Sequence, residues 1–464
     1  MLRSEPILTA QDLLTAVTRM WEVSAPKLRA IDADWPPGSG APVFTIEGRY
    51  TARGWTEWTQ GFQFGSALLQ FDATGDPWFL ETGRTATWER MRVHVTHIGV
   101  HDHGFNNVST YGNLWRLGRE GRVDMSAAEA RGLELALAAS GAVQAARWTK
   151  TAGGGGFVHS FNGPHSLFVD TLRSLRSLAL AHQLGHVLMG EHDERISLLG
   201  RLVAHARATA TYSVYYGQGR DTYDVRGRTA HESIFNATDG LYRCPSSQQG
   251  WSPFTTWTRG LAWAMCGFAE QLEWLATLPG DELDPLGGRA EVETFMREAA
   301  QATCDFYIAN TPTDGVPYWD TGAPGLTHLG DYLERPADPF NSHEPVDSSA
   351  AAIGAQGLLR LGRYLLGRGE PVGSKYWQAG LTVSRTLLDE PYLSEDPAHQ
   401  GLLLHSVYHR PNGWDHVPAG RTVPSGESCM WGDYHLRELA TYLGRVGRNE
   451  TYHSFFGPPR VEAR

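Results

Sequence analysis

The sequence predicts an all-α fold, an (α/α)6 barrel in which six inner helices form a ring inside six outer ones. Apolar residues recur at helical spacing in about a dozen segments, and loops rich in glycine, proline and aspartate separate them. A helix start of the form Trp-Thr-x-Gly occurs twice, at Trp58 and Trp257, and an apolar helix follows each copy. Two copies of one helix start indicate a repeated architecture whose equivalent helix ends face a shared centre. An open helical solenoid is the main alternative.

The expected helices follow one another along the chain. Thr9 is expected to cap the first helix, about residues 9–31, because Asp12 stands three residues later as in a capping box. Since no linker is long or biased enough to separate two domains, residues 1–464 are expected to form a single barrel domain on which this first helix packs. Short strand-like turns are expected near residues 212–216 and 221–225. We expect the other helices at residues 57–74, 77–97, 104–119, 126–149, 166–184, 193–210, 255–277, 289–310, 347–366, 373–391 and 432–447.

Composition and charge exclude some classes of partner. The 464 residues are 41% hydrophobic and 20% charged, which is ordinary for a soluble protein with a large core. The net charge of −11 argues against nucleic acid and against an anionic membrane surface. Sixteen tryptophans are many, and such an excess fits the stacking of sugars, although large helical cores also use tryptophan.

The cysteines and the N-terminus predict a cytoplasmic protein. Four cysteines have neither metal-binding nor disulfide spacing, and we interpret them as reduced thiols. They are Cys244, Cys266, Cys304 and Cys429. The first residues lack the apolar core of a signal peptide, and no apolar run reaches the roughly 18 residues of a membrane span.

The helix expected at residues 255–277 has two unlike faces. An apolar stripe of the kind found in cores contains Trp257, Leu261, Met265, Phe268 and Leu272. Arg259 and Trp263 stand four residues apart on another face and are therefore expected to stack. A guanidinium beside an indole suits an anionic sugar, because the ring offers an apolar face and the arginine a forked donor for a carboxylate. The alternative is an amphipathic core helix whose arginine is solvated.

Two aspartates are candidates for acid/base chemistry. Asp102 and Asp170 each stand where an apolar helix is expected to begin. An aspartate in that position commonly caps the helix or interacts with its dipole. Apolar surroundings and a second carboxylate nearby would instead raise the pKa, because two like charges in one pocket cannot both ionise easily. If the two side chains meet in space, they form an acid/base pair.

Metal and nucleotide chemistry are not expected. His101 and His103 flank Asp102, but no partner cluster of histidine or cysteine has suitable spacing, and we interpret residues 191–194 as a polar loop. The sequence contains no Walker loop, no GxGxxG before a helix and no GxSxG. No metal and no organic cofactor are therefore expected.

The order of short motifs along the chain resembles that of the unsaturated glucuronyl hydrolases, glycoside hydrolase family 88. The resembling segments run in family order from about residue 55 to 447. They are Trp58-Thr-Gln-Gly-Phe62, His101-Asp-His-Gly-Phe105, Val169-Asp170, Gln249-Gly250, Trp257-Thr-Arg-Gly-Leu-Ala-Trp263, Val316-Pro-Tyr-Trp-Asp320, Asp347-Ser-Ser-Ala-Ala-Ala-Ile353 and Gly432-Asp-Tyr434. The resemblance implies a single catalytic (α/α)6 barrel that hydrates the 4,5-double bond of an unsaturated uronic acid left by a polysaccharide lyase.

The resemblance also implies roles for individual residues. Asp170 matches the general acid/base, and Asp102 matches a second essential carboxylate that contacts the sugar hydroxyls. Residues that match or extend the substrate-binding set are Trp58, Trp148, His231, Gln249, Trp257, Arg259 and Trp263. Residues 250–256 read Gly-Trp-Ser-Pro-Phe-Thr-Thr where relatives usually carry acidic residues, a departure that concerns the leaving-group subsite.

The expected substrate is an unsaturated uronic-acid oligosaccharide from glycosaminoglycan, gellan or a similar polysaccharide. Protonation at C4 of its enol ether creates an oxocarbenium-like centre at C5, to which water adds. Ordinary glycosidases use their two carboxylates differently, at the anomeric carbon. Three alternatives remain open: an unsaturated rhamnogalacturonyl hydrolase acting on pectin fragments, a sugar epimerase that uses paired histidines, and a non-catalytic sugar-binding protein.

Overall fold

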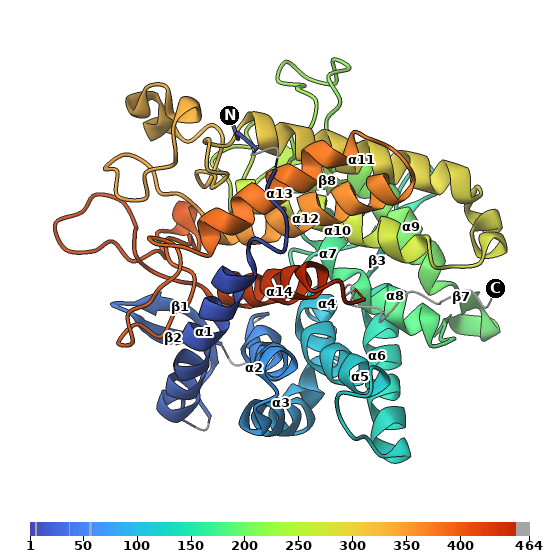
Figure 1. Ribbon diagram of the computed structural model, residues 1–464. Coiled ribbons are helices and arrows are strands. Elements are labelled where there is room, and N and C mark those ends of the chain that lie inside the picture. Colours follow the sequence, from blue (N-terminus) through green and yellow to red (C-terminus); the bar gives the residue numbers. More distant parts are fainter. Residues whose placement is uncertain (5–6, 37, 55–57, 452–464) are drawn as a thin grey trace.

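Helices arranged as two concentric layers make up the fold of the computed structural model, which describes residues 1–4, 7–36, 38–54 and 58–451 (Figure 1). The inner helices are α2 (Gln60–Thr74), α4 with α5 (His103–Asn107, Asn113–Arg119), α7 with α8 (Thr171–Ser174, Arg176–Gln183), α10 (Thr258–Leu275), α12 (Ser348–Gly367) and α14 (Met430–Gly447). The outer helices are α1 (Leu14–Asp34), α3 (Pro77–Arg90), α6 (Ala127–Ala146), α9 (Leu198–Ala208), α11 (Arg289–Ala309) and α13 (Gly373–Leu387).

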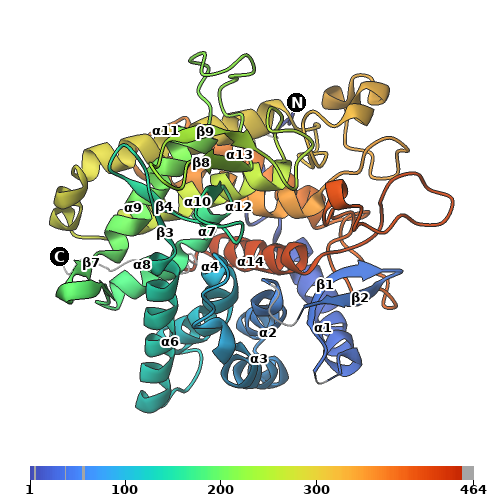
Figure 2. The same ribbon diagram turned by 180° about the vertical axis from the view of Figure 1, so that it is seen from behind.

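The inner helices close into a ring. Each packs against the next in chain order, and α14 returns to pack against α2. Each outer helix covers a neighbouring inner one, with α1 lying against α14 and α2. The two views of the ribbon show the same order around the molecule (Figures 1 and 2). The closed ring confirms the predicted (α/α)6 barrel, and an open solenoid is excluded because its first and last helices would not meet.

Burial separates the two layers. Every residue of α10 is buried, whereas α1 buries only one face. An inner helix is covered by the outer layer on one side and by the ring interior on the other, so both of its faces need partners. The two unlike faces predicted for residues 255–277 are therefore both internal, and the interpretation of a solvated arginine is wrong, since Arg259 is only 1% exposed.

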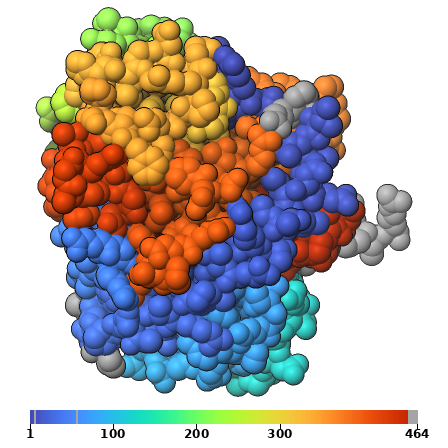
Figure 3. Space-filling view, turned by 60° about the vertical axis from the view of Figure 1, so that its left-hand side comes forward, coloured from blue at the N-terminus to red at the C-terminus, as the bar shows by residue number. Residues whose placement is uncertain are grey.

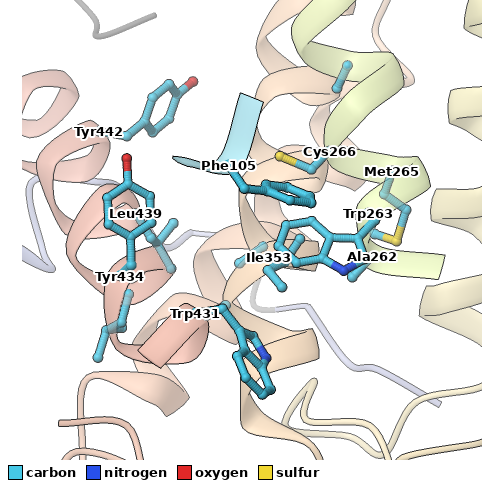
Figure 4. Close-up of a cluster of buried hydrophobic side chains, with 14 of the residues drawn as sticks. Phe105, Ala262, Trp263, Met265, Cys266, Ile353, Trp431, Tyr434, Leu439 and Tyr442 are labelled. Atoms are coloured by element: carbon cyan, nitrogen blue, oxygen red, sulfur yellow. The ribbon is translucent and has the colours of Figure 1, made fainter. Parts of the chain in front are cut away.

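Aromatic side chains from several inner helices fill the centre of the ring. Figure 4 shows Phe105 of α4 close to Trp263 of α10, with Trp431 and Tyr434 of α14 nearby. The ring centroids of Phe105 and Trp263 are 4.9 Å apart. Because aromatic rings bury a large apolar area each, this cluster fixes the ends of the inner helices relative to one another.

Short strands lie at helix ends and in loops. They are β1 (Ala41–Ile46), β2 (Arg49–Arg53), β3 (Trp148–Lys150), β4 (Gly156–Val158), β5 (Ser166–Phe168), β6 (Leu188–Met189), β7 (Arg195–Ile196), β8 (Glu232–Phe235) and β9 (Tyr242–Ser246). The order β5-β8-β9 forms a small antiparallel sheet, and β5 leads directly to Asp170. This sheet therefore sets the position at which α7 begins.

Several predicted helix boundaries are wrong where strands intervene. The helix expected at 126–149 ends at Ala146, because β3 pairs with β4. The helix expected at 166–184 begins only after β5, and the one expected at 193–210 begins at Leu198. Glu57, the expected start of the helix at 57–74, lies outside the described residues. Near the two expected strand-like turns, the structure has a single bridge between Val214 and Thr229.

Long loops gather at one end of the barrel. The segments 310–347 and 388–429 lie on the side that comes forward in Figure 3, and 388–429 is next to β1 and β2. Inner helices α10, α12 and α14 begin at this end, each directly after a loop. Within the described part of the chain, no helix has the length and apolar character that crossing a membrane would require.

Candidate active site

A pocket of about 280 Å³ opens where four inner helices begin. Trp58 lies just before α2, while Asp102, Asp170 and Trp257 hold the position that precedes the first turn of α4, α7 and α10 respectively. The residues that line the pocket are Gly54, Trp58, Val100, His101, Asp102, Phe105, Phe161, Phe168, Asp170, Gln249, Trp257, Arg259 and Trp263. The ring thus brings together residues that are up to about two hundred positions apart in the sequence.

Seven of the predicted site residues line this pocket, and an eighth supports it. His231 lies behind the wall, with its ring 4.5 Å from that of Phe168 and 4.7 Å from that of Trp257. Its Nδ1 accepts hydrogen bonds from the backbone N–H groups of Gln248 and Gln249, at 3.0 and 3.3 Å. Burial lowers the pKa of His231 to about 4, so the ring is neutral and its proton resides on Nε2.

Trp148 is a correction, because the structure places it outside the pocket. Its ring lies on β3 under the guanidinium of Arg201, 3.9 Å from the ring centroid. The backbone of Gly156 lies so close to the ring that a Cβ there would come within 2.4 Å of it. Trp148 therefore packs against Arg201 and Gly156 and does not line the pocket that holds the two aspartates.

The two aspartates occupy helix-capping positions without capping. Neither Asp102 nor Asp170 makes a side-chain capping hydrogen bond to its helix. Both are buried, with exposed fractions of 7% and 8%. Asp170 Oδ1 faces His101 Nε2 at 3.3 Å instead of a backbone group of its helix. A buried carboxylate that caps nothing is costly to the fold, so these two side chains are better explained by a ligand than by helix stability.

One histidine nitrogen touches both carboxylates. His101 Nε2 is 3.3 Å from Asp170 Oδ1 and 3.7 Å from Asp102 Oδ1. Burial would lower the pKa of His101, but the two aspartates outweigh it and raise that pKa above its usual value. The sequence analysis considered His101 only as a metal ligand, although its place next to Asp102 was a signal for a role beside the aspartates.

The pKa values of the two carboxyl groups are shifted in opposite directions. Burial, the largest effect, raises the pKa of Asp102. Burial also acts to raise the pKa of Asp170, but its contact with His101 prevails and leaves that pKa lowered. The sequence analysis expected apolar surroundings and a second carboxylate to raise the pKa, whereas contact with His101 favours the carboxylate form of Asp170.

Arg259 is held by protein acceptors rather than left open for a ligand. Its Nη1 donates to Asp347 Oδ2 at 2.8 Å and to the carbonyl of Val407 at 2.7 Å. Its Nη2 donates to Gln249 Oε1 at 2.8 Å and to the carbonyl of Tyr408 at 2.9 Å. These four bonds use all four N–H groups of the two terminal nitrogens. The forked donor predicted for a substrate carboxylate is therefore already occupied.

The expected stack of Arg259 on Trp263 is also replaced by another arrangement. The guanidinium lies 4.6 Å from the ring centroid of Trp257 and 5.0 Å from that of Trp431. Trp263 instead packs against Phe105 and His435, each at 4.9 Å between ring centroids. Helical spacing alone did not reveal this, because Trp431 comes from α14, which is distant in the sequence.

Arg259 fixes the orientation of Gln249. An arginine can only donate, so the oxygen of the glutamine amide must be the atom that faces it. The amide nitrogen of Gln249 then points away from Arg259. Because Gln249 lines the pocket, its two N–H groups are available to an acceptor there.

Aromatic rings form the walls. Trp58 stacks on Trp431 at 4.9 Å between ring centroids and with an angle of 30°. Phe161, which is 55% exposed, lies nearly parallel to His101 at 6.0 Å. Apolar walls around a few polar groups are typical of a pocket that binds a small molecule. Among the described residues, no three histidine, cysteine or carboxylate side chains come together as a group that could hold a metal ion.

Comparisons with known proteins point to one family, although no family model matches the chain. An unsaturated glucuronyl hydrolase of Bacillus sp. (strain GL1) is 26% identical over 407 residues, covering 86% of this chain and 89% of the relative. An unsaturated chondroitin disaccharide hydrolase of Streptococcus agalactiae is 23% identical over 391 residues, 82% of this chain and 80% of the relative.

Solved structures show the same fold. The crystal structure of the unsaturated glucuronyl hydrolase of Bacillus sp. GL1 aligns with a TM-score of 0.69 at 22% identity, over 96% of this chain and 99% of that one. An unsaturated glucuronyl hydrolase specific for heparin aligns with a TM-score of 0.71 at 18% identity, over 94% and 98%.

The barrel, its aromatic pocket and the buried carboxylates, together with the curated relatives, indicate a glycoside hydrolase of the (α/α)6 type. Within that class, the relatives that this chain is similar to over most of its length include unsaturated glucuronyl hydrolases, glycoside hydrolase family 88.

Proposed function

We propose that this protein hydrolyses unsaturated uronic-acid oligosaccharides, which are products of polysaccharide lyases. It hydrates the 4,5-double bond of the unsaturated glucuronic acid at the non-reducing end and releases a 4-deoxy-5-keto uronic acid. The observation that carries this proposal is the pair Asp102 and Asp170, two buried carboxylates that cap no helix and meet at one aromatic pocket. Relatives that are named unsaturated glucuronyl hydrolase have the same fold and align with this chain over most of its length.

The pocket offers contacts for one anionic ring. Trp58 and Trp263 supply apolar faces for the sugar. The amide N–H groups of Gln249, which Arg259 aims away from itself, can donate to the uronate carboxylate. The N-terminal ends of α2 and α10 add the positive ends of two helix dipoles. Arg259 therefore acts on the substrate through Gln249 rather than by direct contact of its terminal nitrogens.

Asp170 is the acid and then the base. Its proton is delivered to C4, the π bond breaks, and positive charge develops at C5 next to the ring oxygen. Water attacks C5, and Asp170 takes one proton from that water. The hemiketal then opens to the ketone, and the glycosidic bond breaks without attack at the anomeric carbon. Asp102, whose pKa is raised by burial, is placed to hydrogen-bond the sugar hydroxyls.

A panel of lyase-derived disaccharides tests this proposal. The conjugated enoate absorbs in the ultraviolet, so hydration removes the absorbance as turnover proceeds. The panel includes unsaturated disaccharides from chondroitin, heparin and gellan, with rhamnogalacturonan fragments as the pectin alternative. Loss of absorbance on at least one uronic-acid disaccharide is expected. Binding without any loss of absorbance across the panel would contradict the proposal and favour a non-catalytic sugar-binding protein.

We also propose that the protein acts in the cytoplasm. All four cysteines are free thiols, three of them buried and Cys244 exposed. An exposed free thiol is stable in a reducing compartment and prone to oxidation outside it. Cell fractionation followed by immunodetection tests this, and recovery outside the cytosol would contradict it.

A further inference from the structure

His101 lies between the two carboxylates of the pocket and has no part in the steps above. Its ring is 2% exposed, with Phe161 nearly parallel to it at 6.0 Å and Phe168 at an edge at 5.5 Å. These aromatic neighbours restrict the ring, and its Nε2 atom is directed at Asp170 (3.3 Å) and Asp102 (3.7 Å). The contact is therefore built into the site rather than made by a mobile side chain.

The nitrogen that faces the carboxylates must carry a hydrogen. A bare lone pair directed at two carboxylate oxygens would be repelled by both, whereas an N–H group is attracted by both. Two carboxylates in a pocket that also receives a carboxylate of the substrate would place three negative charges close together. A protonated imidazole at this point offsets one of them.

Among the other groups around His101, Arg147 acts to lower the pKa of Asp102, but within the described residues it forms no ion pair with either aspartate. Arg147 donates to the carbonyls of Ile98, His159 and Ser160, which hold its guanidinium to the backbone. Three further histidines face this region and are kept neutral by burial, which lowers the pKa of His159 and His231 to about 4 and that of His205 to about 3. His101 differs from them because both aspartates touch its ring.

We propose that His101 is a positioning residue that stores the catalytic proton as an imidazolium bridging Asp102 and Asp170. The inference deepens the proposed function and depends on it. When the sugar fills the pocket and displaces water, the charged pair of imidazolium and carboxylate becomes less favourable than the neutral pair. The Nε2 proton then passes to Asp170, which becomes the acid that the reaction needs.

The proton balance closes over one turnover. Asp170 gives the proton to C4, forming the C4–H bond as the π bond breaks. Water forms the C5–O bond and loses a proton to the Asp170 carboxylate, which returns it to His101 Nε2. One water molecule is consumed, and both residues regain their starting state. His101 acts through Asp170 and need not touch the substrate.

Two substitutions separate a stored proton from a simple N–H contact. In His101→Gln, the amide nitrogen lies about where Nε2 lies, so the N–H group is kept while the ability to carry a proton is lost. In His101→Asn, the amide nitrogen lies about where Nδ1 lies, so both are lost. We expect both variants to keep KM within about threefold of the wild type while kcat falls at least about 100-fold.

The pH dependence of kcat distinguishes a stored proton from a structural role, because the loss of a structural contact would leave the shape of the profile unchanged. In the wild type, kcat should fall on the alkaline side as His101 loses its proton. In His101→Gln that limb should disappear, and the residual rate should rise steadily as the pH falls, because Asp170 must then be protonated from solvent. A His101→Gln profile that superimposes on the wild type, with kcat restored, would overturn the proposal.

A remote histidine serves as the matched control. His182 at the end of α8 pairs with Glu282 at 2.6 Å, far from the pocket residues. His182→Gln makes the same chemical change and should leave kcat, KM and the pH profile as they are. A shift in this control equal to that of His101→Gln would show a general effect of the substitution and would also overturn the proposal.

A measurement on the unsubstituted protein covers the case in which the variants fold poorly. With histidines labelled by ¹⁵N, the His101 signals should show an imidazolium in the resting wild type at neutral pH and lose it in Asp170→Asn. A neutral His101 across the active pH range would refute the stored proton. If the wild type turns over no unsaturated disaccharide, the proposed function fails, and the ¹⁵N signals still report separately on His101.

Discussion

Four buried aspartates stand at or near the starts of inner helices, and they form two contrasting pairs. Asp347 accepts hydrogen bonds from the backbone and hydroxyl of Ser349 and forms an ion pair with Arg259. Asp433 accepts from the backbone of residues 402 and 403 and from the hydroxyls of residues 50 and 428. Asp102 and Asp170, by contrast, cap nothing and share contact with His101.

The difference shows that the number of hydrogen-bond donors around a buried carboxylate distinguishes a structural carboxylate from a functional one. All four side chains are buried, so burial alone does not distinguish them. A buried carboxylate with a full set of hydrogen-bond donors stabilises the fold. A buried carboxylate without such donors destabilises the fold until a ligand supplies them. The comparison predicts that the two pairs respond oppositely to the same change, aspartate to asparagine.

The largest expected effect is on turnover in Asp170→Asn. The substitution removes the proton donor and keeps the shape, so kcat should fall by at least about a thousandfold, equivalent to about 4 kcal/mol in the activation barrier. Stability should fall slightly at neutral pH, because the contact with His101 that lowers the Asp170 pKa in the folded state is weakened. Steady-state kinetics with substrate binding by calorimetry measures both. Retention of more than a tenth of the wild-type rate would remove Asp170 from the mechanism.

Asp347→Asn should act on the fold instead. It leaves the buried guanidinium of Arg259 without its counter-ion, which typically costs about 3–5 kcal/mol. Urea unfolding, monitored by tryptophan fluorescence, measures the loss, with Asp170→Asn as the matched control. Equal destabilisation of the two variants would erase the proposed distinction between the pairs.

Gln249→Ala should weaken binding more than chemistry. It removes the amide N–H groups that Arg259 directs into the pocket, and hydrogen bonds to a charged group are worth about 1.5–3 kcal/mol. KM should rise at least about tenfold with a smaller change in kcat, since the contact is made in both the ground and the transition state. A fall in kcat at constant KM would assign Gln249 to the chemical step.

The smallest expected effect is a gain of stability in Asp102→Asn. Burial raises the pKa of Asp102 in the folded state, so folding favours the protonated form of its side chain. As the pH rises through this folded-state pKa, the buried side chain ionises, and its ionised form lowers the stability of the fold. Asparagine removes that penalty, and the variant should be slightly more stable than the wild type at neutral pH. The gap should close as the pH falls below the ordinary aspartate pKa. Urea unfolding across pH tests this sign, and a gap that widens on acidification would contradict it.

Local patterns in the sequence predicted the barrel, whereas most of the pocket residues were predicted from the resemblance to a known family. The repeated starts at Trp58 and Trp257 place helix ends at one centre, and the aspartates stand where helices begin. Trp148 could not be placed, because the pairing of β3 with β4 ends the helix before it. The partners of Arg259 come from residues 347, 407 and 408, far along the chain, so helical spacing could not foresee that its donors are occupied.

The most direct test of the mechanism is the fate of C4 in heavy water. A proton delivered by Asp170 from one side of the ring should place deuterium at one of the two C4 positions of the product, together with loss of the enoate absorbance. Product made in light water and then kept in heavy water controls for later exchange. We predict a single, stereospecific deuterium in samples quenched early. Early release of an unsaturated uronic acid with its double bond intact, or deuterium spread over both faces of C4, would contradict the account.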